Sequence, residues 1–547
     1  MNSKSNFLRF VATAAFALAA FLFFALLYSY HIYNQEINQL FEFDGRYLIA
    51  TIAHIGGFAD CLSRFLTQFF YFYWAGAFIY ALILAALQMA VFRAFTIRNG
   101  FSFVASFFPS AIIWIFLLST EAVLSGPLAI LISLVTASSV ARISRDAVRL
   151  SVSCILIPSL YFLLGPASIV FAIMMAIREK RVLHAGLYVL CPFVGYFVGN
   201  MPLDRLFYGL EYYKMHTMCP IFLWIAVAVI VIFILTDTFF GWPGKRGWAF
   251  SGAVTSILLA VLAVYHFSSF SRERSLKYEI LTINNAWNRI ITDAARKAPS
   301  NTIEMACLNL ALTKTGHIGS HLFDFPQSGP ECLVPESQAS FLYGLAVSEI
   351  YWQIGMTNPA NRLAFEAQAC IPDFQKSAWC YRRLARTNIA SGKYSVAFKY
   401  LTPLLHTLFH KKWAEEQIAL MRNHSLIHDH PDYKANVRTR YRDRDYLFSY
   451  EMMTGMLEMN YYEDVDNRTA LDYLLVWSLL SRDLRTFITY CPFEGYTKVP
   501  SIYQEAYLMW EEDTNPELKE LPEYISSEIV EKYRNGRTPY YKYFTAK

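Results

Sequence analysis

Long apolar runs alternate with short polar gaps over the first 270 residues of the chain. A membrane-spanning helix needs about 20 mostly apolar residues, and about nine runs approach or reach that length. The predicted spans cover approximately 8–31, 70–92, 102–119, 124–141, 151–164, 166–178, 182–199, 220–240 and 248–268. We therefore expect residues 1–270 to form a polytopic bundle of transmembrane helices.

The fifth and sixth runs form one apolar stretch that is interrupted only at Gly165-Pro166. One interpretation is a single long helix, which reverses the topology of every later segment. The other is a pair of short tilted helices that turn at the Gly-Pro pair. The second interpretation keeps all later basic clusters on one side, so the distribution of charge favours it.

Lys and Arg gather in alternate gaps between the apolar runs. The clusters are Lys4/Arg9, Arg93/Arg98, Arg142/Arg145/Arg149, Arg178/Lys180/Arg181 and Lys245/Arg246. Cytoplasmic loops of membrane proteins are enriched in these two residues. The pattern predicts a cytoplasmic N-terminus, outer loops at about 32–69 and 200–219, and residues 271–547 outside the cytoplasm.

From residue 271 onward, helical patterns of moderate length are separated by Gly, Asn and Pro. Two stretches resemble tetratricopeptide units, in which small residues let two helices approach closely. Their matching positions are Tyr351, Gly355, Ala360, Ala367 and Pro372, followed by Leu384, Ala385, Gly392, Tyr394, Ala397 and Leu401. We predict an all-α protein, with a bundle of about nine spans followed by a soluble tetratricopeptide-like repeat domain over 271–547.

The composition agrees with a chain that is half membrane protein and half globular. Hydrophobic residues make up 55% and aromatic residues 17%, with a mean hydropathy of +0.28. The net charge of +5 comes largely from the clusters between spans, so we expect no nucleic-acid partner. The nine cysteines form no CxxC pair, which argues against a metal ribbon or a thioredoxin-type site. Buried free thiols are the favoured interpretation, and a single bridge such as Cys307–Cys332 is the alternative.

An acidic motif, Glu42-Phe-Asp44-Gly-Arg46, lies in the first outer loop. Its position resembles that of the acidic motif in GT-C glycosyltransferases, polytopic enzymes that take a sugar from a polyprenyl-phosphate donor. The resemblance implies that Asp44, with Glu42, is catalytic and holds a divalent metal or acts as a base. Arg46, Arg205 and Lys214 would then face the phosphates of the donor. The alternative is a solvated motif that keeps the loop out of the bilayer.

Glu121 is a further acidic candidate, in the turn between the third and fourth predicted spans. It would border a ligand cavity in one interpretation and cap a helix in the other.

Three segments give the chain as a whole a resemblance to an uncharacterised family of Bacteroidota integral membrane proteins. They are GGFADCLSRFLTQFFYFYWAG (56–76), LNLALTKTGHIGSHLFDFPQSGP (308–330) and MLEMNYYEDVDNRTALDYLLVWSLLSRDL (456–484). The resemblance implies a bacterial inner membrane with the helical domain in the periplasm. It implies no activity and no catalytic residues.

Two functional hypotheses follow. The first is an inner-membrane protein that anchors a periplasmic helical-repeat domain, which binds an envelope protein or glycan on its concave surface. The second is a GT-C-type glycosyltransferase acting at Glu42 and Asp44. No serine-hydrolase, P-loop, Rossmann or kinase motif is present in the sequence. We favour the first hypothesis, and whether the chain is an enzyme stays open at this point.

Overall fold

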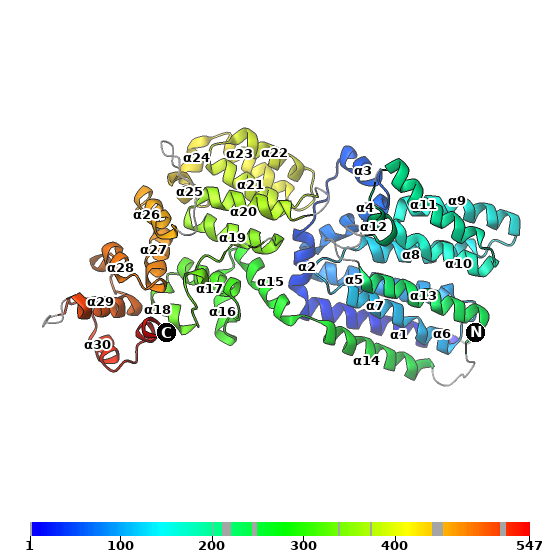
Figure 1. Ribbon diagram of the computed structural model, residues 1–547, viewed down its shortest axis with the longest axis horizontal. Helices are drawn as coiled ribbons and strands as arrows, with labels where there is room; N and C mark the ends of the chain where they lie inside the picture. Colours follow the sequence, from blue (N-terminus) through cyan, green and yellow to red (C-terminus); the bar gives the residue numbers. More distant parts are fainter. Residues whose placement is uncertain are drawn as a thin grey trace. The chain divides into compact units, whose positions relative to one another are not determined.

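The computed structural model describes residues 3–199, 201–209, 220–242, 249–336, 338, 340–371, 375–439, 452–514 and 521–546. These residues form helices, turns and loops without a β-strand, so the all-α prediction is confirmed for them (Figure 1). The chain divides into two compact units. The first contains the described residues up to Glu273 and the short segments Ile371–Ala378 and His406–His410, and the second contains the remainder.

The first unit is built from helices of very different length. They are α1 (Ser3–Leu22), α2 (Ser29–Ile37), α3 (Gly45–Ile52), α4 (Gly57–Thr67), α5 (Tyr73–Ala94), α6 (Gly100–Ala105), α7 (Phe107–Phe116), α8 (Ser125–Val140), α9 (Asp146–Leu164), α10 (Ile169–Glu179), α11 (Leu183–Gly199), α12 (Leu203–Tyr208), α13 (Ile221–Phe239) and α14 (Ala249–Phe267). The division between the units falls inside α15 (Phe270–Ile283).

Four helical segments among the described residues are long and apolar enough to cross a membrane. They are Asn6–Leu27, Tyr73–Ala94, Asp146–Leu164 and Ile221–Phe239. The bent pair Ser251–Phe267 and Phe270–Ile283 adds a fifth if it counts as one span. Three further apolar helices, Gly100–Phe116, Ser125–Val140 and Leu183–Phe197, are shorter than a typical span.

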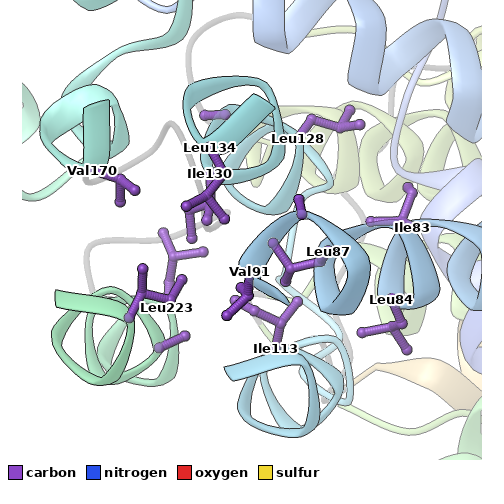
Figure 2. Close-up of a cluster of buried hydrophobic side chains, with 14 of the residues drawn as sticks. Ile83, Leu84, Leu87, Val91, Ile113, Leu128, Ile130, Leu134, Val170 and Leu223 are labelled. Carbon is purple, nitrogen blue, oxygen red and sulfur yellow. The ribbon is translucent and has the colours of Figure 1, made fainter. Parts of the chain in front are cut away.

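The core of the first unit lies between α5, α7, α8, α10 and α13. Figure 2 shows side chains of this core from all five helices: Leu87 from α5, Ile113 from α7, Ile130 from α8, Val170 from α10 and Leu223 from α13. Large apolar side chains also cover the outward faces of these and neighbouring helices. Among them, Leu82 is 57% exposed, Leu262 64% and Phe197 80%. Helices that are apolar on every side are typical of a membrane environment.

The segments that carry the basic clusters lie together at one end of the first unit. Hydrogen bonds and an ion pair join them: Arg9 to the carbonyl of Arg98 (3.4 Å), Arg178 to the carbonyl of Ala94, Arg149 to Glu179 (3.1 Å), and Asp237 to the amides of Thr96 (2.6 Å) and Ile97 (3.1 Å). The fifth basic cluster, Lys245/Arg246, lies outside the described residues.

The other connecting segments between the apolar runs lie together at the opposite end of the first unit. The contacts there are Tyr30 and His31 with Glu273, Gln35 with the carbonyl of Thr120 (3.0 Å), Gly56 with the carbonyl of Phe162 (2.7 Å), and Tyr161 with the carbonyl of Leu206 (2.9 Å). The helices between the two sets of gaps therefore run from one end of the unit to the other.

The apolar stretch at residues 151–177 is interrupted at Gly165. Helix α9 ends at Leu164, Gly165 has a φ of +76°, and a 3-10 turn at Pro166–Ser168 leads into α10. Glycine adopts this left-handed backbone at little cost, and proline cannot continue the preceding helix. The predicted break is thus present, because both residues act on the backbone locally.

The described residues of the second unit form helices and the segments that connect them. After α15 they are α16 (Trp287–Arg296), α17 (Thr302–Lys314), α18 (Ile318–His321), α19 (Phe341–Ile354), α20 (Thr357–Ala369), α21 (Ala378–Ala390), α22 (Tyr394–Leu405), α23 (Lys411–Met421), α24 (His424–Asp429), α25 (Lys434–Arg438), α26 (Met453–Glu463), α27 (Arg468–Leu480), α28 (Leu484–Tyr490), α29 (Ser501–Thr514), α30 (Ser527–Arg534) and α31 (Pro539–Thr545).

The two stretches with tetratricopeptide-like spacing each contain a pair of helices. Gly355, with a φ of +101°, separates α19 from α20, and Gly392, with a φ of +70°, separates α21 from α22. Ala360 and Ala397 are fully buried, as the close approach of paired helices requires. Both glycines occupy a backbone conformation that other residues adopt rarely.

Candidate functional site

Asp44, the predicted catalytic residue, is the N-cap of α3. Its carboxylate oxygen Oδ2 accepts hydrogen bonds from the backbone amides of Arg46 (3.1 Å) and Tyr47 (3.2 Å). A helix leaves its first amides without intrahelical partners, and an aspartate at this position satisfies them. The structure therefore gives Asp44 a role in starting α3.

Glu42 is buried and forms an ion pair with a residue from the later part of the chain. Its Oε1 lies 3.0 Å from Nζ of Lys376, in one of the two short segments that belong to the first unit. Nε2 of His410 lies 3.2 Å from Oε1 of Glu36, at hydrogen-bond distance. A cavity of about 20 Å³ beside Glu36 and His410 has room for about one water molecule, and neither Glu42 nor Asp44 lines it.

The remaining predicted residues occupy separate elements. Arg46 is exposed on α3, and Arg205 is half-buried on α12. Burial lowers the pKa of the nearby His54, and the positive charge of Arg205 lowers it further. Glu121 lies in the turn between α7 and α8, and Lys214 lies outside the described residues.

Replacing Asp44 tests its capping role against a catalytic one. Asp44→Asn keeps a good N-cap, so we expect unchanged thermal stability of the full-length protein in detergent and unchanged complementation of a deletion strain. Asp44→Ala removes the cap, and we expect a loss of about 1 kcal/mol from the stability of this region. Loss of complementation by a normally expressed and folded Asp44→Asn protein would instead show that the carboxylate is needed for chemistry.

A much larger cavity, which the sequence analysis missed, lies in the second unit. Its volume is about 810 Å³. Its walls come from the end of α17, from α18, from the first turns of α27 and α29, from α30 and from the segment 496–500. Cavities that hold small-molecule ligands in proteins have volumes of about 300–1,000 Å³, so this one is large enough for a binding site.

The cavity has four basic and two acidic side chains. They are Lys314, Arg468, Lys498 and Lys532, with Asp472 and Glu528. Arg468 lies 3.5 Å from Asp472, and Lys532 lies 2.6 Å from Glu528. Among the described residues, Lys314 and Lys498 have no carboxylate within ion-pair distance. The cavity thus carries two more basic groups than acidic ones, although Lys498 lies near enough to Glu528 to help Lys532 lower the pKa of that carboxyl group.

Burial changes the proton affinities of two of these groups. It raises the pKa of Asp472 to about 6, and Arg468 partly offsets this effect. Lys314 borders the open cavity yet is surrounded by enough protein that burial lowers its pKa. Its ammonium donates a long hydrogen bond to the hydroxyl of Thr469, at 3.5 Å.

Two tyrosines line the cavity, and their hydroxyl groups are buried in the protein behind its wall. Tyr503 is 1% exposed, and its hydroxyl has no hydrogen-bond partner. The hydroxyl of Tyr496 is also without a partner, and its ring lies under the guanidinium of Arg468 at 4.4 Å. A buried hydroxyl that makes no hydrogen bond is costly, so each such group calls for an explanation.

Two glycines shape the wall formed by α17 and α18. Helix α17 ends at Lys314 with Thr315 as its C-cap, and Gly316, with a φ of +74°, then turns the chain toward α18. Gly319 lets α18 approach α29, because a Cβ atom there would lie 2.8 Å from Pro500 and 3.0 Å from the ring of Tyr503. A side chain at either position would alter the wall.

Residues that line the cavity come from two of the segments singled out in the sequence. The segment 308–330 supplies Lys314 and the turn around Gly316, and the segment 456–484 supplies Arg468 and Asp472. These charged residues follow ordinary helical spacing, so their meeting was not evident from the sequence. No group of metal-ligating side chains occurs among the described residues, and the eight cysteines within them are free.

The fold and the cavity define an all-helical protein that joins a strongly apolar unit to a second unit with a polar, mainly basic cavity. The chain belongs to the "Family of unknown function (DUF6057)", which it matches over residues 4–542. The predicted membership of an uncharacterised family is thus confirmed. No curated protein and no solved structure matches the chain.

Proposed function

We propose that the protein is an integral protein of a bacterial inner membrane, with a cytoplasmic N-terminus and a periplasmic second unit that binds an envelope component. The cavity of about 810 Å³ in the second unit is the observation that carries this proposal. It combines sufficient volume with converging charged and hydroxyl groups, which is the usual form of a small-ligand site. The paired helices around Gly355 and Gly392 support a tetratricopeptide-like architecture for this unit.

The arrangement of the first unit supports nine membrane crossings. Its helices connect two sets of gaps at opposite ends, and its outward faces are apolar. Several crossings, such as α8 and α10, are shorter than a typical span. A membrane accommodates short apolar helices by local thinning of the bilayer, at modest cost per ångström.

The gathering of the basic gaps at one end supports the orientation. Arg9, Arg98, Arg149 and Arg178 take part in contacts at that end. Lys and Arg mark the cytoplasmic side of a membrane protein. An odd number of crossings then places the second unit in the periplasm.

Binding, and not glycosyl transfer, is the activity we propose. An ion pair with Lys376 accounts for the buried Glu42, and a helix cap accounts for Asp44. Both carboxylates thus have structural roles in the first unit.

Reporter fusions test the topology on which this function depends. We expect a fusion after Arg181 to report a cytoplasmic location and a fusion after residue 270 to report a periplasmic one. The turn at Gly165-Pro166 decides the result, because without it the orientation of all later segments reverses. A periplasmic signal at Arg181 with a cytoplasmic signal at 270 would contradict the proposed function, since the second unit could not meet an envelope ligand.

A further inference from the structure

The charges and hydrogen-bonding groups of the cavity in the second unit, in addition to its volume, indicate the class of ligand that it binds. We propose that it binds an anionic saccharide, which is a sugar that bears a phosphate or a carboxylate group. This inference rests on the proposed function, because it names the ligand class of the periplasmic unit. Three independent features of the cavity support it.

The first feature is the excess of positive charge. Four basic groups face two acidic ones, and the two existing pairs, Arg468–Asp472 and Lys532–Glu528, leave Lys314 and Lys498 to face the cavity. A basic group without a carboxylate partner is well placed to donate a charge-assisted hydrogen bond to a ligand anion. A neutral ligand would leave the net positive charge of the cavity uncompensated.

The second feature is the direction of the helices that line the cavity. Arg468 and Thr469 are the first residues of α27, and Ser501 is the first residue of α29. The N-terminal end of a helix carries a partial positive charge, which favours anions. Two such ends therefore reinforce the side-chain charge at the same cavity.

The third feature is a wall that carries accessible hydroxyl groups. Ser320 and Ser501 supply them, next to the side chains of Tyr496 and Tyr503. A hydroxyl both donates and accepts, so such a wall complements the hydroxyls of a sugar ring. The volume of about 810 Å³ is far larger than a lone phosphate ion requires.

Asp472 makes the site sensitive to pH. Burial raises the pKa of this carboxyl group to about 6. The other groups that face it are Arg468, Tyr496, Tyr503 and Cys491, and Lys314, Lys498, Glu528 and Lys532 border the same cavity. Protonation of Asp472 removes a negative charge from the cavity and frees Arg468 from its ion pair with this carboxylate. We therefore expect the affinity for an anion to increase as the pH falls through 6.

The test measures binding to the full-length protein in lipid nanodiscs by titration calorimetry. The probes are a glucuronic-acid disaccharide, glucose 1-phosphate, the neutral disaccharide maltose, inorganic phosphate and an acidic peptide. We expect one or both charged sugars to bind more tightly than maltose, phosphate or the peptide. The two charged sugars distinguish a carboxylate from a phosphate as the recognised group.

Two substitutions locate the site. Lys314→Met should weaken binding of the charged sugar at least about tenfold, because one charge-assisted hydrogen bond is lost. Ser320→Ala should also weaken binding while thermal stability stays the same, because it removes an exposed hydroxyl from the wall of the cavity. Lys399→Met, on the exposed face of α22, is the matched control and should bind like the wild type.

The possible results separate this inference from the function on which it rests. Equal binding of maltose and the charged sugars, or an unchanged affinity in Lys314→Met, overturns the anionic ligand and leaves a neutral binding module. Preference for the acidic peptide, or no binding of any charged sugar at millimolar concentration, overturns the saccharide. Failure of the proposed function itself is recognised separately, by a cytoplasmic fusion signal after residue 270.

Discussion

Arg383→Met should destabilise the second unit by about 3–5 kcal/mol, the usual cost of breaking a buried ion pair. Arg383 on α21 is 4% exposed and pairs with the fully buried Glu349 on α19. Its guanidinium also lies 5.2 Å from the centre of the Trp352 ring. Methionine fills much of the same space but leaves the charge of Glu349 buried without a cation. Gln353, which donates to Glu349 at 2.7 Å, compensates only in part.

A double-mutant cycle checks that the effect comes from this pair. Replacing both partners, as Arg383→Met with Glu349→Leu, removes the uncompensated charge and should restore most of the lost stability. The measurement is urea unfolding of the full-length protein in detergent, with hydrogen exchange to assign the loss to α19 and α21. Lys411→Met is the control, because its partner Glu415 lies 3.9 Å away on the surface and such pairs contribute about 0–1 kcal/mol. Strictly additive effects of the two single changes would refute the pairing argument.

Gly57→Ala, at the first residue of α4, should have the second large effect. A Cβ atom at Gly57 would lie 2.9 Å from the carbonyl carbon of Ile52 and closer still to the carbonyl oxygen of Thr51. Both neighbours are backbone atoms, so no change of side-chain rotamer relieves the clash. Overpacking costs about 1–3 kcal/mol, and we expect the upper part of that range here.

The effect of Gly57→Ala appears as a fall of several degrees in the melting temperature of the detergent-solubilised protein. Gly45→Ala is its control in the same loop. Gly45 is the first residue of α3, and a Cβ atom there meets nothing within 4 Å. The alanine should be neutral or stabilise by up to about 1 kcal/mol, because it restricts the unfolded chain. Equal melting temperatures for the two variants would show that α3 and α4 move apart freely.

The sequence by itself determined the features that depend on neighbouring residues. Apolar runs of helical length predicted helices of the first unit, because the apolar positions of a helix recur within a few residues and are visible in a short stretch of sequence. The break at Gly165-Pro166 and the turns at Gly355 and Gly392 were also evident. Each of these depends on backbone preferences that act within one or two turns of helix.

Only the tertiary structure decided which charged residues meet. Glu42 pairs with Lys376, which lies 334 positions away in the chain, and the cavity combines Lys314 with Arg468 and Tyr503. No local spacing records these meetings, because each helix presents charged residues at ordinary intervals. The partner of a charged group is set by how distant helices pack.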